Sequence, residues 1–302
     1  MRPTRSARSS RQRLSVAIRA EAQGNNVRHA CRFLGVTESG YYAWRSRPTS
    51  PRALRRIFLA GQIVEVHRDS AGVYGAHRIT AELRFGRQVI AGHNAVSAIM
   101  RELGIKGLPN RRLPRSARVG RAGGPDLVRR KFARDAPDEL WMTDITEHPT
   151  REGKIYCCVV LDAFSRRVVG WSIDSTQTTV LVTNALGMAT RRRDPTGGLV
   201  IHSDRGAQFT SWSFSQNVRE AGLAPSIGAI GCPYDNAVIE AFWGRMQVEL
   251  LNRKSWKTRI ELASAIHDYI ELFHNTRRRH SALGMLTPTE YEDRYFHTHN
   301  AA

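Results

Sequence analysis

The sequence has no long apolar run. Across its 302 residues, no apolar stretch approaches the roughly 20 residues that a transmembrane helix needs. The first residues are rich in arginine and no apolar segment follows them, so the pattern of a secretory signal is missing. We therefore expect an intracellular, cytoplasmic chain that makes no contact with a membrane.

Cysteine is scarce as well. The four cysteines form no CxxC pair, and the histidines near them do not complete the spacing of a zinc site. Cys157 and Cys158 lie inside an apolar run, which indicates packing in a core. Disulfide-rich and cysteine-ligated zinc folds are thus excluded as explanations of this chain.

Acidic residues are few relative to basic ones. The chain has 46 Lys and Arg against 27 Asp and Glu, which gives a formal charge of +19. No fold needs such an excess, whereas binding to a polyanion benefits from it. Because the excess is clustered along the sequence, it favours contact with a nucleic acid over a merely soluble surface.

Two clusters of positive charge stand out. The first 20 residues form an arginine-rich arm with no acid before Glu21. Residues 110–134 contain nine Lys and Arg against Asp126 alone, and their glycines and prolines prevent a long regular element. We interpret them as a basic arm and a basic linker that can follow phosphates, although ordinary solvated segments have the same composition.

The chain between these clusters is predicted to be helical. Residues 27–44 have the pattern of helix, turn and helix, with Gly35 ending the first helix and Thr37 or Ser39 beginning the second. A second set of short helices follows, with Ile57, Ile63, Val64 and Val66 predicted to share the buried face of its first helix. We divide the chain into 1–56, a helical subdomain 57–109, the linker 110–134 and a core 135–296.

The core begins with three predicted strands, Leu140–Ile145, Ile155–Leu161 and Val168–Ile173, which follow one another closely enough to form an antiparallel meander. Helices and strands then alternate. We expect a helix near Thr179–Arg191, a strand that ends at Asp204, a helix near Phe209–Ala221, a strand near Ala224–Ile227 and a helix through Glu240.

Three acidic residues in this core are candidates for a common site. Asp144 lies within the first strand, Asp204 ends a later strand, and Glu240 begins a long helix 36 positions further on. A carboxylate at the carboxyl end of a central strand lies where α/β sheets usually bind ligands. Each signal is weak alone, because an aspartate at a strand end is often a turn residue or a helix N-cap.

The motifs around these acids resemble those of a known family. They are Trp141–Thr146, Leu161–Trp171, His202–Phe209, Asp235–Trp243 and Asn275–Gly284. Together and in this order they are similar to the DDE transposases of bacterial insertion sequences, whose catalytic core is of the retroviral-integrase type. The resemblance implies an α/β, RNase-H-like core with a mixed five-stranded sheet and flanking helices, preceded by small all-α helix-turn-helix-like units.

The resemblance also implies chemistry. Asp144, Asp204 and Glu240 would be the catalytic, metal-binding triad for Mg²⁺ or Mn²⁺, with two ions expected. The expected reaction is cleavage at the 3′ ends of an insertion sequence followed by strand transfer into target DNA. A non-catalytic DNA-binding regulator and a general RNase-H-like nuclease are the alternatives.

Further residues are candidates for DNA contact. Gln247 lies seven positions after Glu240, where the family usually has a basic residue, and Arg245 is expected to compensate. The full candidate set comprises Arg111, Arg112, Asn236, Arg245, Gln247, Arg277, Arg278 and Arg279. By the resemblance the partners are element and target DNA in the nucleoid, further copies of the chain, and a helix-turn-helix and leucine-zipper product of an upstream frame.

Overall fold

The computed structural model describes residues 14–16, 21–24, 26–109, 134–195, 197–204, 206–227 and 237–299. By its contacts the chain divides into two compact units, residues 1–60 and 61–302. Most of the predicted basic arm, and all of the predicted linker except Arg134, lie outside the described ranges. Within those ranges, no helix combines the length and the apolar character needed to cross a membrane.

The first unit contains the predicted helix, turn and helix. Helix α2 spans Val27–Leu34 and helix α3 spans Glu38–Arg45. Gly35 ends α2 in the left-handed conformation with φ of 66°, and the Thr37 side chain accepts a hydrogen bond from the Gly40 amide at the start of α3. Cys31 and Tyr41 are buried between the helices, so this part of the prediction is confirmed.

The second unit begins within a longer helix. Helix α4 spans Pro51–Asp69, and α5 (Ala76–Phe85) and α6 (His93–Glu102) follow it. Ile63 and Val66 are buried as predicted, whereas Ile57 and Val64 are exposed. The prediction is wrong for Ile57 and Val64. These residues are seven positions apart and so share one face of α4, and that face is exposed.

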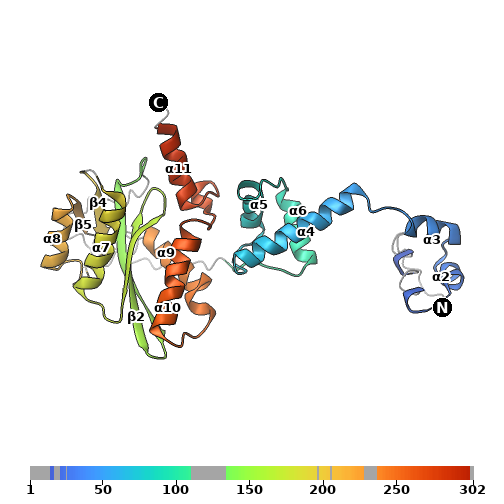
Figure 1. The fold of residues 1–302 in the computed structure, drawn as a ribbon, viewed down its shortest axis with the longest axis horizontal. Coiled ribbons are helices and arrows are strands. Elements are labelled where there is room, and N and C mark those ends of the chain that lie inside the picture. The colour runs from blue at the N-terminus through green and yellow to red at the C-terminus, as the bar shows by residue number, and fades with distance from the viewer. Residues whose placement is uncertain are drawn as a thin grey trace, which may run out of the picture. The chain divides into compact units, whose positions relative to one another are not determined.

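The remainder of the second unit is built on a mixed five-stranded sheet (Figure 1). Its strands are β1 (Leu140–Thr150), β2 (Gly153–Asp162), β3 (Val168–Asp174), β4 (Val200–Ser203) and β5 (Ala224–Ile227). The order across the sheet is β3-β2-β1-β4-β5. The first three strands form the predicted antiparallel meander, while β4 and β5 run parallel to β1.

Helices cover both faces of this sheet, as Figure 1 shows. On one face lie α9 (Ala237–Glu249), α10 (Arg259–His267) and the π-helix Asp268–His274; on the other lie α7 (Thr179–Arg193) and α8 (Trp212–Glu220). Successive residues of β1 point to opposite faces, so Leu140 and Met142 join the first core while Trp141 joins the second. This alternation decides which side chains of β1 can meet α9.

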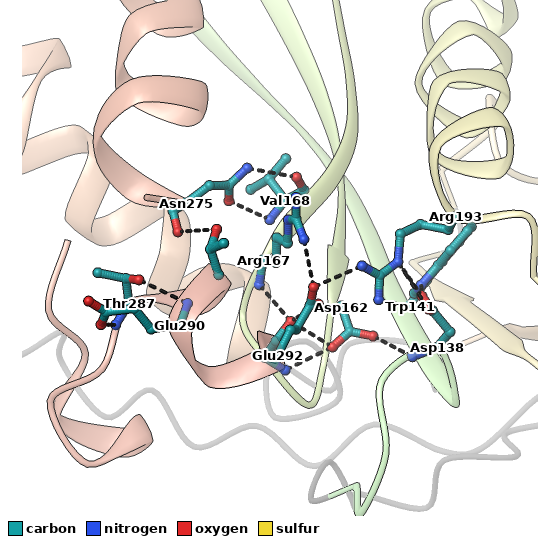
Figure 2. A network of polar contacts seen from close by, with 12 residues as sticks. Asp138, Trp141, Asp162, Arg167, Val168, Arg193, Asn275, Thr287, Glu290 and Glu292 are labelled. Carbon is teal, nitrogen blue, oxygen red and sulfur yellow. Dashed lines mark hydrogen bonds and ion pairs between the residues drawn. The ribbon is translucent and has the colours of Figure 1, made fainter. Parts of the chain in front are cut away.

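The last helix, α11 (Pro288–His299), is fixed to the sheet by buried polar contacts (Figure 2). Glu292 is 1% exposed, and its Oε2 accepts from Arg167 Nη1 at 2.7 Å and from Arg193 Nη1 at 2.8 Å. The Asn275 side-chain amide accepts a hydrogen bond from the N–H of Val168 and donates one to the carbonyl of Val168. These contacts hold the C-terminal segment against the ends of β3 and α7.

Candidate active site

Asp144 and Asp204 lie at the same level of two neighbouring strands. In the parallel pair of β1 and β4, Met142 is opposite His202, and each aspartate follows two residues later. Residues two apart on a strand point to the same face. Asp144 therefore extends the row that begins with Met142, and Asp204 directly follows the end of β4 beside it.

That row faces α9. Met142 belongs to the core beneath α9 and α10, so Asp144 is directed to the same side of the sheet. The Trp243 indole on α9 donates a hydrogen bond to Asp144 Oδ2 at 3.0 Å. This bond ties the central strand to the helix that carries the third acid.

Glu240 lies one helical turn before Trp243 on α9. Ile239, Phe242 and Met246 are buried against the sheet and fix the rotation of the helix. Because residues three apart share a helix face, Glu240 is presented on the side from which Trp243 reaches Asp144. Val238 is partly buried and packs against the same core.

The Asp144 carboxylate responds to the charges of the other two acids. Burial raises the pKa of Asp144 from 3.8 to about 6, and the negative charges of Asp204 and Glu240 contribute to the rise. The Ile145 amide and the Trp243 indole oppose it by hydrogen bonding to the charged form. Burial also raises the pKa of Glu240. A buried carboxylate whose pKa is raised further by neighbouring carboxylates is typical of a functional site.

The backbone after Asp204 supports its carboxylate. The Gly206 amide donates to Asp204 Oδ1 at 2.9 Å. A Cβ added at Gly206 would lie 3.1 Å from that oxygen, which is tighter than nearly all real contacts. Glycine at this position thus leaves room for the side chain of Asp204.

The chemistry of these residues fits a hard divalent cation, since Mg²⁺ and Mn²⁺ prefer carboxylate oxygens. In the part of the chain that the structure describes, no three His, Cys, Asp or Glu side chains are gathered closely enough to enclose a metal ion. Asp204 and Glu240 nevertheless both raise the pKa of Asp144 through their charges.

The predicted DNA-contact residues are placed very differently from one another. Gln247 lies on the same side of α9 as Glu240 and donates to Asn252 Oδ1 at 2.7 Å. Arg277 is exposed. Arg245 lies five positions after Glu240, about 140° around the helix, so it cannot replace a basic residue at 247.

Arg278 and Arg279 are buried rather than exposed, at 1% and 3%. Arg278 pairs with Glu249, and Arg279 pairs with Glu82 and Glu290. A guanidinium enclosed with its own carboxylate is not offered to a DNA backbone, so these two residues do not fit the predicted role. Asn236, Arg111 and Arg112 lie outside the described residues.

Sequence reasoning gave Trp243 no role, although it is the side chain that contacts Asp144. Its position three residues after Glu240, on the same helix face, was the available signal. His202 is buried, with Nδ1 2.9 Å from Ser226 Oγ, and belongs to the support of the site.

Comparisons with protein families agree with this architecture. Residues 134–233 and 221–288 each match a family model described as an integrase core domain, and residues 54–112 match an HTH-like domain. The sheet order, the flanking helices and these matches confirm the RNase-H-like fold. A solved structure of the HTLV-2 integrase catalytic core domain aligns with 52% of this chain and 98% of its own, at 18% identity and a TM-score of 0.40.

Curated relatives cover nearly the whole chain. The transposase for insertion sequence element IS904 of Lactococcus lactis is 34% identical over 248 residues, which are 82% of this chain and 98% of the relative. The transposase InsF for insertion sequence IS3A of Escherichia coli is 33% identical over 273 residues, 89% of this chain and 94% of the relative. The chain belongs to the transposases of bacterial insertion sequences, a family of polynucleotidyl transferases with an integrase core domain.

Proposed function

We propose that this transposase cleaves DNA at the 3′ ends of an insertion sequence and joins the freed 3′-hydroxyl to target DNA, using Asp144, Asp204 and Glu240 as its catalytic residues. The placement of Asp144 and Asp204 at one level of adjacent strands, facing the helix that carries Glu240, is the observation that supports this most. The relatives named as transposases support the same reaction class.

The three carboxylates would hold Mg²⁺ or Mn²⁺, two ions by analogy with other phosphoryl-transfer sites. When bound, such ions activate the attacking oxygen and stabilise the leaving oxygen of an in-line displacement. By the family resemblance, Asp144 would be the central ligand of the three. Asp204 is exposed and Glu240 is half-buried in the first turn of α9, so both have freedom to approach Asp144.

The remaining residues of the site would position these groups. The Trp243 indole restrains Asp144 Oδ2, and the Gly206 amide restrains Asp204 Oδ1. The Trp243 donor favours the ionised form of Asp144, which is the form that binds a cation. No protein nucleophile is required, because a water molecule and then the DNA 3′-hydroxyl would attack phosphorus.

DNA would be held by surfaces around this site. Gln247 and the exposed Arg277 are the described candidates, and Asn236, Arg111 and Arg112 are carried forward from the sequence. We also propose that the chain acts as a multimer on DNA in the nucleoid. An upstream-frame helix-turn-helix and leucine-zipper product would be a further partner.

A strand-transfer assay tests the proposal. Labelled DNA carrying the element's own ends is incubated with the chain and Mg²⁺, and 3′ cleavage and joined products are measured separately. Asp204→Asn should reduce both by about 10²-fold or more, because it removes a ligand charge and leaves size and shape unchanged. Asp194→Asn is the control, since Asp194 is an exposed aspartate at the end of α7.

The outcomes separate the three functions considered. Cleavage followed by joining, both sensitive to Asp204→Asn, is the expected result. Cleavage without joining would indicate a nuclease, and DNA binding without either activity would indicate a regulator. Cleavage that Asp204→Asn leaves unchanged would overturn the assignment of the site.

A further inference from the structure

A basic cavity lies behind the catalytic helix. It has a volume of about 260 Å³ and is lined by residues of α5, the turn between β2 and β3, α9 and the C-terminal segment. Four arginines contribute to its wall: Arg78, Arg166, Arg245 and Arg278. His274 and His280 lie among them, and the described residues of the lining include no acid.

Among the described residues, Arg278 alone of these four arginines forms an ion pair. Arg278 has its partner Glu249. For Arg78, Arg166 and Arg245, no carboxylate of the described residues lies within ion-pair distance. Burial, together with the charges of Arg278 and Arg245, lowers the pKa of Arg78 to about 10, and burial and Arg278 lower the pKa of Arg245; the charge of Glu249 opposes both shifts. Like charges enclosed together with fewer counterions than cations oppose folding.

Two buried polar atoms of the lining also lack partners. Arg166 Nη1 and His280 Nε2 have almost no exposed surface and form no hydrogen bond within the described structure. His280 is 9% exposed, and its pKa is lowered well below 6.5 by burial and by the surrounding cations, so its ring is neutral. Buried groups of this kind are normally satisfied, and a bound ligand is one way to satisfy them.

The backbone holds Arg166 in an unusual conformation. Its φ is 63°, in the left-handed region that non-glycine residues seldom adopt. The turn is fixed by the Arg166 amide, which donates to the Asp162 carbonyl at 2.9 Å, and by the His274 ring, whose Nε2 lies 2.8 Å from the Arg166 carbonyl. Strain that is retained in this way tends to mark functional positions.

We propose that this cavity binds a phosphate group of DNA. Planar guanidinium groups match the oxygens of a phosphate in charge and geometry, and a tetrahedral anion can accept from several donors that converge from different elements. The assignment of the phosphate to DNA rests on the proposed function, whereas the preference for a phosphate group rests on the cavity itself.

The site is distinct from the triad. Arg245 and Glu240 lie about 140° apart around α9, so the phosphate sits on the opposite side of the helix from the carboxylates. It would join three parts of the unit. Arg78 belongs to the HTH-like subdomain, Arg166 to the sheet and Arg245 to the catalytic helix. DNA bound here would therefore hold the HTH-like subdomain against the helix that presents Glu240.

The experiment uses the full chain in metal-free buffer, where nothing is cleaved. Arg166→Gln and Arg245→Gln are compared with Arg219→Gln, which changes an exposed arginine on α8. First, thermal unfolding is measured in phosphate and in chloride at equal ionic strength. Wild type and Arg219→Gln should gain several degrees in phosphate. The two cavity variants should lose at least half of that gain, and should melt higher than wild type in chloride because repulsion is relieved.

Second, binding to a fluorescent duplex is followed by anisotropy as salt is increased. Each cavity variant should reduce the slope of log affinity against log salt by about 1, the amount expected for one phosphate contact. Arg219→Gln should leave the slope unchanged. Arg245→Lys keeps the charge, so it should keep the slope. A reduced slope in Arg245→Gln but not in Arg245→Lys would show that the lost charge is the cause.

Two results would overturn the proposal. If the cavity variants respond to phosphate as wild type does, the cavity does not bind phosphate. If they lose the phosphate response and keep the full salt slope on DNA, the ligand is a free phosphate and not the DNA backbone. Neither measurement depends on cleavage, so an inactive chain would contradict the proposed function and leave this inference standing.

Discussion

The guanidinium of Arg278 lies directly against the carboxylate of Glu249, with side-chain exposures of 1% and 5%. Arg278 Nε donates to Glu249 Oε2 at 2.7 Å, and Nη2 donates to Oε1. The Tyr269 hydroxyl also donates to Glu249 Oε2, at 2.9 Å. The pair fastens the segment that follows the π-helix to the end of α9.

We expect Arg278→Met to destabilise the fold strongly. The substitution leaves Glu249 buried with Tyr269 as its remaining donor, and breaking a buried pair from one side costs about 3–5 kcal/mol. Arg277→Met, at the exposed neighbouring position, should change the free energy of unfolding by no more than about 0.5 kcal/mol. Urea unfolding monitored by circular dichroism measures both. Equal effects of the two substitutions would mean that the pair carries no structural role.

Glu292 gives a second prediction about stability. Glu292 is 1% exposed, and its carboxylate accepts hydrogen bonds from Arg167 and Arg193 in the network that Figure 2 shows. Glu292→Gln removes the charge while nearly preserving the shape, so two arginines lose their shared counterion. We expect a loss of about 2–4 kcal/mol in urea unfolding, because charged hydrogen bonds are among the strong ones. Asp293→Asn, at the adjacent exposed position, is the control, and a comparable loss there would contradict this account.

Local patterns predicted much of the fold correctly. The strand Ala224–Ile227 has the expected bounds, and Gly35 and Thr37 end and begin the helices where the sequence predicted. Apolar runs and caps depend on neighbouring residues, so one sequence is enough to find them. The predicted division into domains stays a prediction.

Long-range pairing could not be predicted in the same way. Three consecutive arginines at 277–279 indicate an exposed basic tip, yet the partners that bury two of them are distant in the chain. Glu249 is 29 residues from Arg278, and Glu82 is 197 residues from Arg279. Only the fold brings such groups together, and the same holds for the arginines of the cavity.

The raised pKa of Asp144 leads to a prediction about pH. The folded chain retains a proton on Asp144 up to about pH 6, whereas the unfolded chain releases it near 3.8. Ionisation of this group therefore lowers the stability of the metal-free fold as pH rises through that window, and the full penalty is present at neutral pH. Asp144→Asn should melt several degrees higher than wild type at neutral pH in EDTA.

The higher melting temperature of Asp144→Asn should disappear below about pH 4, where Asp144 of the wild type is protonated in both the folded and the unfolded chain. Added Mg²⁺ should raise the melting temperature of wild type and have less effect on the variant, since a cation that binds only the folded state stabilises it. Differential scanning calorimetry across pH gives all three comparisons. A variant less stable than wild type at neutral pH would show that the Asp144 charge is already compensated.

The final prediction concerns the uncharged residue at 247. Gln247 lies on the Glu240 side of α9 and bonds only to Asn252 among the described residues, so a lysine there would extend a positive charge beside the triad. Gln247→Lys should tighten binding to element-end DNA and steepen the salt slope by about 1, because one more phosphate is neutralised. Gln216→Lys adds the same charge to α8, where Glu220 lies 2.8 Å from the Gln216 amide nitrogen, and should have little effect. Anisotropy titrations over a series of salt concentrations measure both variants. Equal steepening by both would mean that the gain reflects net charge alone and that the 247 position does not face DNA.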